Sequence, residues 1–148
     1  MKNNDNSCFF QNSKSKNTQI QRKHQNQNPK GEKIFDIRER SFQFALRIIE
    51  ISNKLPNSLP FNIIRSQVLK SGTSIGANIE EADGSISKID FLNKAIIARK
   101  EAKETKYWLR IIDSQKIKNH DIKNDIDEIQ EIINILSVMI NKVRNVKN

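Results

Sequence analysis

Residues 72–76, Gly-Thr-Ser-Ile-Gly, form a Gly-x-Ser-x-Gly pattern that could carry catalysis. In hydrolases this pattern marks a nucleophile elbow, where a strand enters a sharp turn and a nearby histidine activates the serine. Here the flanking apolar residues repeat at helical spacing. The two histidines, His24 and His120, are expected in a tail and in a link between helices. We therefore predict that Ser74 is not catalytic and that the protein is not an enzyme.

A metal site in a helical bundle would use Glu-x-x-His pairs on two helices. Neither histidine has an acidic residue three positions before it. The acidic run over residues 121–131 lacks the glycine and the spacing of a calcium-binding loop. The sequence also lacks a glycine-rich phosphate loop, so we predict neither a metal nor a cofactor.

Six basic residues are expected on the outer face of the third helix, with two aromatic residues among them. Basic side chains neutralise phosphates and aromatic rings stack on bases, so binding of RNA or DNA is one explanation. The other is a solvated face crossed by salt bridges, which is commoner, because Glu101 and Glu104 lie within one turn of several of the cations. The residues are Lys94, Arg99, Lys100, Lys103, Lys106 and Arg110, with Tyr107 and Trp108.

Four amphipathic helices must position these residues, and we expect an all-α, up-down-up-down four-helix bundle. The helices are predicted from Phe35 to Lys54, from Phe61 to Asp83, from Ser87 to Gln115 and from Asp121 onward. Ser87 and Asp121 are suited to N-capping. Acidic residues fill the first turns of the last helix, and we expect them only to complement the helix dipole. They are Asp121, Asp125, Asp127 and Glu128.

The second and third helices are predicted to form the closest pair. Glycine in a helix interior costs roughly 1 kcal/mol relative to alanine, so Gly72 and Gly76 are expected to permit a close helix approach. The expected partner is a seam of mostly small residues on the third helix. The seam consists of Phe91, Ala95, Ala98, Ala102, Thr105, Leu109 and Ile112.

The first helix carries a second apolar face beside its core face. A helix in an isolated bundle needs only one such face. We therefore predict that the second face forms contacts between subunits of a homo-oligomer. It consists of Phe35, Phe42, Leu46 and Ile49.

Three stretches of the chain, residues 67–82, 87–91 and 97–109, resemble a family of four-helix bundle proteins. This family is the 23S rRNA intervening-sequence proteins, also labelled ribosomal protein S23. The resemblance implies the bundle fold and a ring-shaped homo-oligomer, often a pentamer, but no settled activity. The family pattern has an Asn-x-x-Glu and a further Glu at positions that match Asn78, Glu81 and Glu104. The resemblance therefore implies that these three side chains meet, near Ser74. A polar layer that fixes helix register is one explanation, which we favour; a ligand or metal site is the other.

The 148 residues suit a single domain with a formal net charge of +9. Residues 1–33 hold seven Lys or Arg and two acidic residues, with few large apolar side chains. We predict that they form a disordered basic tail and that residues 34–148 form the bundle. The sequence contains a single cysteine, Cys8, and we find neither an apolar run that could span a membrane nor a signal peptide. We therefore predict a cytoplasmic protein without a membrane partner.

The function that these features favour is a non-enzymatic oligomeric scaffold that binds a protein, or RNA or DNA. The alternative is a catalytic or retroelement accessory factor, such as a nuclease or a helper of a reverse transcriptase. Relatives of this bundle act beside reverse transcriptases as basic oligomers, which supports the binding of nucleic acid by analogy.

Overall fold

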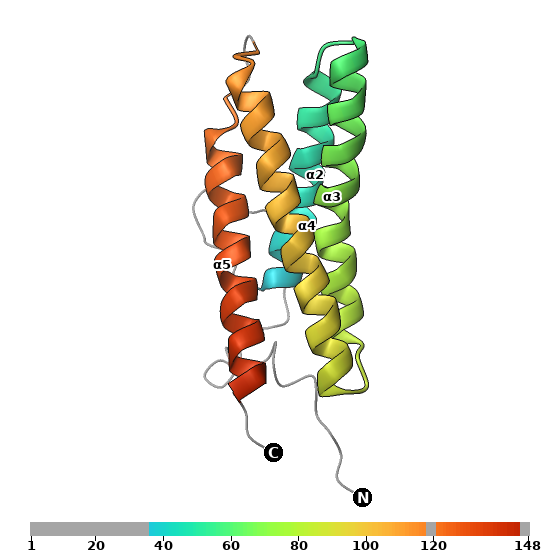
Figure 1. Ribbon diagram of the computed structural model, residues 1–148, viewed down its shortest axis with the longest axis vertical. Coiled ribbons are helices and arrows are strands. Elements are labelled where there is room, and N and C mark those ends of the chain that lie inside the picture. Colours follow the sequence, from blue (N-terminus) through green and yellow to red (C-terminus); the bar gives the residue numbers. More distant parts are fainter. Residues whose placement is uncertain (1–35, 118–120, 146–148) are drawn as a thin grey trace, which may run out of the picture.

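The computed structural model describes residues 36–117 and 121–145. These residues form four α-helices, α2 (Ile37–Lys54), α3 (Leu59–Asp83), α4 (Lys88–Ser114) and α5 (Lys123–Asn145). The helices run alternately up and down in one elongated bundle, and the described residues include no strand (Figure 1). The prediction of an all-α four-helix bundle is confirmed. The predicted tail, residues 1–33, lies outside the described residues.

Polar side chains at the helix starts fix where three of the helices begin. The Asp36 carboxylate accepts a hydrogen bond from the Arg38 amide at 2.9 Å, so α2 begins two residues later than Phe35. The Ser87 hydroxyl accepts from the Asp90 amide at 3.1 Å, and the Asp121 carboxylate accepts from the Lys123 amide at 3.0 Å. The N-cap predicted at Ser87 is therefore confirmed. Asp121 binds the amide of the first residue of α5, so it lies one position before the N-cap residue, Ile122.

The start of α3 differs from the prediction, which placed it at Phe61. The helix begins at Leu59, and Pro60 lies in its first turn. Proline is tolerated there because its missing amide hydrogen would have no partner within the helix. One turn later, the Arg65 guanidinium donates to the carbonyl oxygens of Ser52 at 3.0 Å and Leu55 at 2.8 Å. Arg65 thus adds a second donor at the Ser52 carbonyl, which also accepts from the Leu55 amide, and supplies a donor to the Leu55 carbonyl just past the end of α2.

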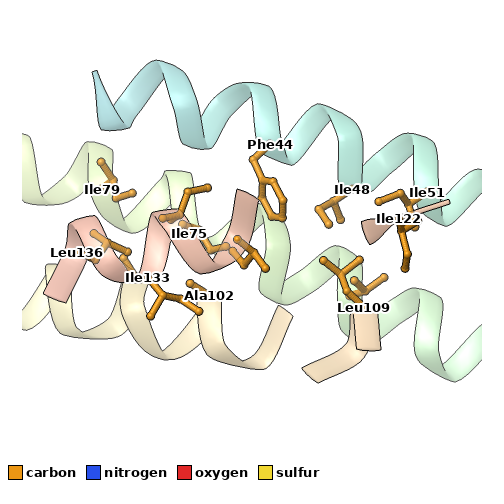
Figure 2. Close-up of a cluster of buried hydrophobic side chains, with 14 of the residues drawn as sticks. Phe44, Ile48, Ile51, Ile75, Ile79, Ala102, Leu109, Ile122, Ile133 and Leu136 are labelled. Carbon is orange, nitrogen blue, oxygen red and sulfur yellow. The ribbon is translucent and has the colours of Figure 1, made fainter. Parts of the chain in front are cut away.

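The main core is a cluster of apolar side chains from all four helices (Figure 2). Phe44 of α2, Ile75 of α3, Leu109 of α4 and Leu136 of α5 are each at most 1% exposed. Full burial of one such side chain stabilises a fold by roughly 1.5–3 kcal/mol. The inward face of every helix is therefore the one that the apolar spacing predicts.

The seam of small residues on α4 is buried, as predicted. Ala98 and Ala102 are fully buried against the main core. In the same seam, the hydroxyl groups of Thr105 and Ser71 are hydrogen-bonded at 2.9 Å between α4 and α3. Both side chains are buried, so this contact satisfies two polar groups that would otherwise be costly to bury.

The two glycines of α3 face α2, so the prediction that they face the alanine seam of α4 was wrong. A Cβ atom at Gly72 would lie 2.8 Å from Ile48 Cγ2, closer than carbon atoms pack. A Cβ atom at Gly76 would lie 3.6 Å from Ser41 Oγ, which is ordinary contact. The close approach is real, but it occurs at Gly72 and involves a β-branched side chain of α2.

We expect alanine to have opposite effects at these two glycines. Gly76→Ala should stabilise the protein by roughly 0.5–1 kcal/mol, because it raises helix propensity and its Cβ fits. Gly72→Ala should destabilise it by roughly 1–2 kcal/mol, because the overpacking cost exceeds the same gain in propensity. Both values can be measured by urea unfolding followed by circular dichroism.

An Ile48→Ala background provides the control, because it removes the two Ile48 carbon atoms nearest to position 72. In that background, Gly72→Ala should cost less than it does beside Ile48. The packing explanation fails if the cost of Gly72→Ala is the same in both backgrounds.

Candidate functional site

An apolar ridge on the outer side of α2 is the largest exposed hydrophobic feature of that helix. Phe42, Leu46 and Ile49 are 56%, 41% and 41% exposed. Their spacing of four and three residues places them in one row, away from the buried Phe44 and Ile48. We call Phe42, Leu46 and Ile49 the α2 ridge. Phe35, the fourth residue predicted for this surface, lies outside the described residues.

Two arginines hold α2 against the first turns of α5. The Arg40 guanidinium makes a two-pronged contact with Glu128, with Nε 2.6 Å from Oε1 and Nη2 3.0 Å from Oε2. Two turns further along α2, Arg47 Nε lies 2.9 Å from Asp125 Oδ1. The guanidinium carbon of Arg47 lies 5.4 Å from the centre of the Phe44 ring. The prediction that Asp125 and Glu128 serve only the helix dipole was therefore wrong.

The Arg40–Glu128 contact changes how Glu128 titrates. Both side chains are mostly shielded from solvent, at 16% and 22% exposure. Hydrogen bonds from Arg40 to the charged carboxylate lower the pKa of Glu128, although partial burial acts in the opposite direction. Glu128 therefore stays ionised at a lower pH in the folded protein than in the unfolded chain.

The residues predicted to form a polar layer have separate partners. The Ser74 hydroxyl donates to the Lys70 carbonyl at 2.7 Å and the Asn78 amide donates to the Ser74 carbonyl at 2.8 Å, both within α3. Glu81 forms an ion pair with Lys94 of α4, and Glu104 accepts from Trp108 Nε1 at 3.3 Å. Within the described part of the chain, no hydrogen bond or ion pair joins Glu104 to Ser74, Asn78 or Glu81.

The buried polar contact between α3 and α4 is instead the pair Ser71 and Thr105. Sequence reasoning assigned Thr105 to the apolar seam and did not single out Ser71. A hydroxyl-bearing residue in the middle of an alanine seam was the signal that could have identified the contact, because a buried hydroxyl needs a partner. Ser74 lies in the interior of α3, so its surroundings differ from the strand-to-helix turn of a hydrolase elbow.

The structure divides the six predicted basic residues into groups. Lys94 lies at the border with α3 and is paired with Glu81, which raises the pKa of Lys94. Lys106 lies at the border with α5 and donates to Gln130 Oε1 at 2.6 Å. Of the others, Arg99 is half-buried. The remaining three are exposed: Lys100, Lys103 and Arg110.

An aromatic pair accompanies these exposed cations on α4. The rings of Tyr107 and Trp108 meet edge to face, with centroids 5.1 Å apart. Tyr107 is 56% exposed, whereas Trp108 packs against the core. The exposed basic surface is therefore smaller than the sequence suggested, and it carries one accessible aromatic ring.

The described residues also bear on membrane and metal sites. Of their four helices, none contains an apolar stretch that could serve as a transmembrane span. Over residues 36–117 and 121–145, no group of three or more His, Cys, Asp or Glu side chains is arranged to hold a metal ion.

The four helices define the chain as a small all-α helical-bundle protein. The chain belongs to the family of 23S rRNA-intervening sequence proteins, whose sequence model matches residues 33–142. A solved structure of a protein with unknown function, from the S23 ribosomal protein family of Bacteroides thetaiotaomicron VPI-5482, is 39% identical with a TM-score of 0.64. The match covers 70% of this chain and 97% of that chain. No curated protein matches this sequence.

We expect Glu128→Gln to lower the free energy of unfolding at pH 7 by roughly 1–3 kcal/mol, because it removes a charged acceptor from a partly buried arginine. The stabilising effect of Glu128 should be complete above its unfolded pKa of about 4.3. It should be lost as the pH falls through the lower folded pKa. Urea unfolding of both proteins between pH 3 and pH 7 measures this difference.

Asp127→Asn is the matched control, because Asp127 is an exposed acidic residue next to Glu128 in the sequence. It should change stability by less than about 0.5 kcal/mol. A difference between the original protein and Glu128→Gln that stays constant down to pH 3 would contradict the proposed linkage.

Proposed function

We propose that this protein is a non-enzymatic scaffold that assembles into a homo-oligomer through the α2 ridge. The single observation that supports this proposal is the exposure of Phe42, Leu46 and Ile49 in one row. Contiguous apolar surface on a soluble protein commonly marks an interaction site. The family resemblance favours a ring, and a pentamer in particular.

The form of the α2 ridge suits contact with a helix of a second copy. Side chains spaced by four and three residues form a ridge that fits the groove between two such rows on another helix. Exposed polar residues border the ridge, among them Glu39, Glu50 and Asn53. An apolar centre with a polar border is the usual composition of a protein interface.

The test is to place charges in the α2 ridge and measure the mass of the assembly. The double substitution Leu46→Glu with Ile49→Glu should reduce the mass measured by light scattering to that of a smaller assembly or a monomer. Helicity measured by circular dichroism should be retained, because neither side chain belongs to the buried core.

Ser66→Glu with Thr73→Glu is the matched control, since it adds the same two charges at exposed positions of α3. This control should leave the mass unchanged. The proposal is wrong if the original protein is already a monomer at micromolar concentration, or if the two double variants behave alike.

A second candidate function is an accessory role in which the protein binds nucleic acid, or a nuclease or reverse transcriptase that acts on it. The observation that favours it is the group of exposed cations Lys100, Lys103 and Arg110 beside the exposed Tyr107 ring. A ring of subunits would repeat this group, so many weak contacts would act together. Such binding would depend little on base sequence, because cations contact phosphates.

Under this second candidate, Lys103→Glu with Arg110→Glu should weaken binding to RNA and to DNA alike. It should also flatten the dependence of affinity on salt, since each phosphate contact adds about 0.9 to the logarithmic slope on duplex DNA. Lys54→Glu with Lys123→Glu changes the net charge equally at exposed positions elsewhere and should have a smaller effect. If the original protein shows no salt-dependent binding near ~100 mM salt, the cations form only a solvated surface.

A further inference from the structure

The second half of α5 extends past the beginning of α2. The Arg40–Glu128 contact aligns the two helices. Only three residues of α2, beginning with Ile37, precede Arg40, and they span about 4.5 Å of helix. From Glu128, α5 continues to Asn145, or about 25 Å. Figure 1 shows the same arrangement, with α2 starting part of the way along the bundle while α3, α4 and α5 continue beyond it.

The part of α5 that has no α2 beside it carries a pocket of about 350 Å³. Ile135, Met139 and Lys142 follow Glu128 at intervals of seven, four and three residues, so they face the same side as Glu128. That is the side on which α2 lies further up the bundle. Val138, which also lines the pocket, is 53% exposed. The lining on α5 consists of Asn134, Ile135, Val138, Met139, Lys142 and Val143.

The core beneath this pocket is distinct from the main core. It is a separate small cluster in which Phe91 and Ala95 of α4 pack with Ile140 and Val143 of α5. Met139 is only partly buried against both this cluster and the main core. Among the described residues, α2 does not reach this level of α5, so the apolar surface here needs another cover to be shielded from water.

We propose that this pocket binds the five residues that precede the N-cap of α2, residues 31–35 of the same chain (Gly-Glu-Lys-Ile-Phe), through the side chains of Ile34 and Phe35. The Asp36 backbone is extended, with φ −78° and ψ 115°, so the chain turns off the helix axis at the upper end of the pocket. Five extended residues span about 16 Å. The rise of α5 from Ile132, level with the start of α2, to Lys142 is about 15 Å.

Three further observations favour this segment over a second copy of the protein. Ile34 and Phe35 are large apolar residues that directly precede Asp36 in the sequence. The segment is tethered directly to α2, so its local concentration exceeds that of a separate molecule. The family match begins at residue 33, so Ile34 and Phe35 belong to the region shared with relatives. In this arrangement Phe35 serves its own subunit, unlike the subunit contact expected from the sequence.

The test measures how readily a thiol in the pocket reacts. In a Cys8→Ser background, Met139→Cys places a single thiol in the pocket of the full-length chain. Adding Ile34→Ser and Phe35→Ser should raise the rate of its alkylation by N-ethylmaleimide at least about tenfold, because the cover loses its apolar contacts. The same two serine substitutions, without the reporter thiol, should lower Tm by roughly 5–15 °C.

Two controls separate docking from a general loss of structure. A reporter at Ile89→Cys, where the native side chain is 72% exposed, should react at the same rate with or without the serine substitutions. Phe9→Ser with Phe10→Ser, which makes a similar change further from α2, should leave both the Met139→Cys rate and Tm unchanged.

The inference is overturned if Ile34→Ser with Phe35→Ser leaves the alkylation rate at position 139 unchanged. It is also overturned if protection at position 139 increases with protein concentration and is independent of residues 34 and 35, because a second copy would then cover the pocket. The result does not depend on the α2 ridge, so the proposed scaffold function can fail while this inference stands.

Discussion

The rotation of α2 about its own axis is the constraint on which the rest of the surface depends. Ile48 packs against the bare backbone of α3 at Gly72, so this side of α2 cannot turn away from α3 without opening a cavity. With Ile48 and Phe44 fixed inward, Phe42, Leu46 and Ile49 must face outward. One packing contact inside the bundle thus decides which apolar side chains the molecule presents outside it.

Ion pairs between neighbouring helices help to hold this arrangement and also reduce the positive charge of the surface. Arg38 contacts Asp83 at 2.7 Å between α2 and α3, while Arg40 contacts Glu128 between α2 and α5. Lys94 and Glu81 are paired between α3 and α4. Each ion pair neutralises a cation that contributes to the net charge of +9, so this cation adds little to the positive potential of the surface. Net charge therefore overstates how much positive potential the bundle offers to a phosphate backbone.

The sequence was sufficient to predict the class of fold, the buried face of each helix and the N-cap at Ser87. These features depend on local spacing and on local hydrogen bonds, which are written in short stretches of the chain. The partner of Gly72 could not be predicted in the same way. Apolar periodicity shows which face of a helix is buried, but it does not show which of two neighbouring helices covers that face.

The candidate site residues were less predictable for a related reason. Glu104 and Asn78 find partners within their own helices, although both could have reached across to another helix. Glu128 and Asp125 do the opposite, because the rotation of α2 brings Arg40 and Arg47 to them. Long polar side chains have several partners within reach, so the relative rotation of two helices selects among them.

The order of the helices around the bundle also bears on how the chain folds. Each helix packs beside the next one in sequence, so most contacts between helices close short loops, which cost little conformational entropy. Chains rich in such local contacts fold quickly. The contact between α2 and α5 is the exception, since it joins the two ends of the described chain. Arg40 and Glu128 therefore act at the most entropically demanding closure of the bundle, where favourable electrostatics offset the longest loop.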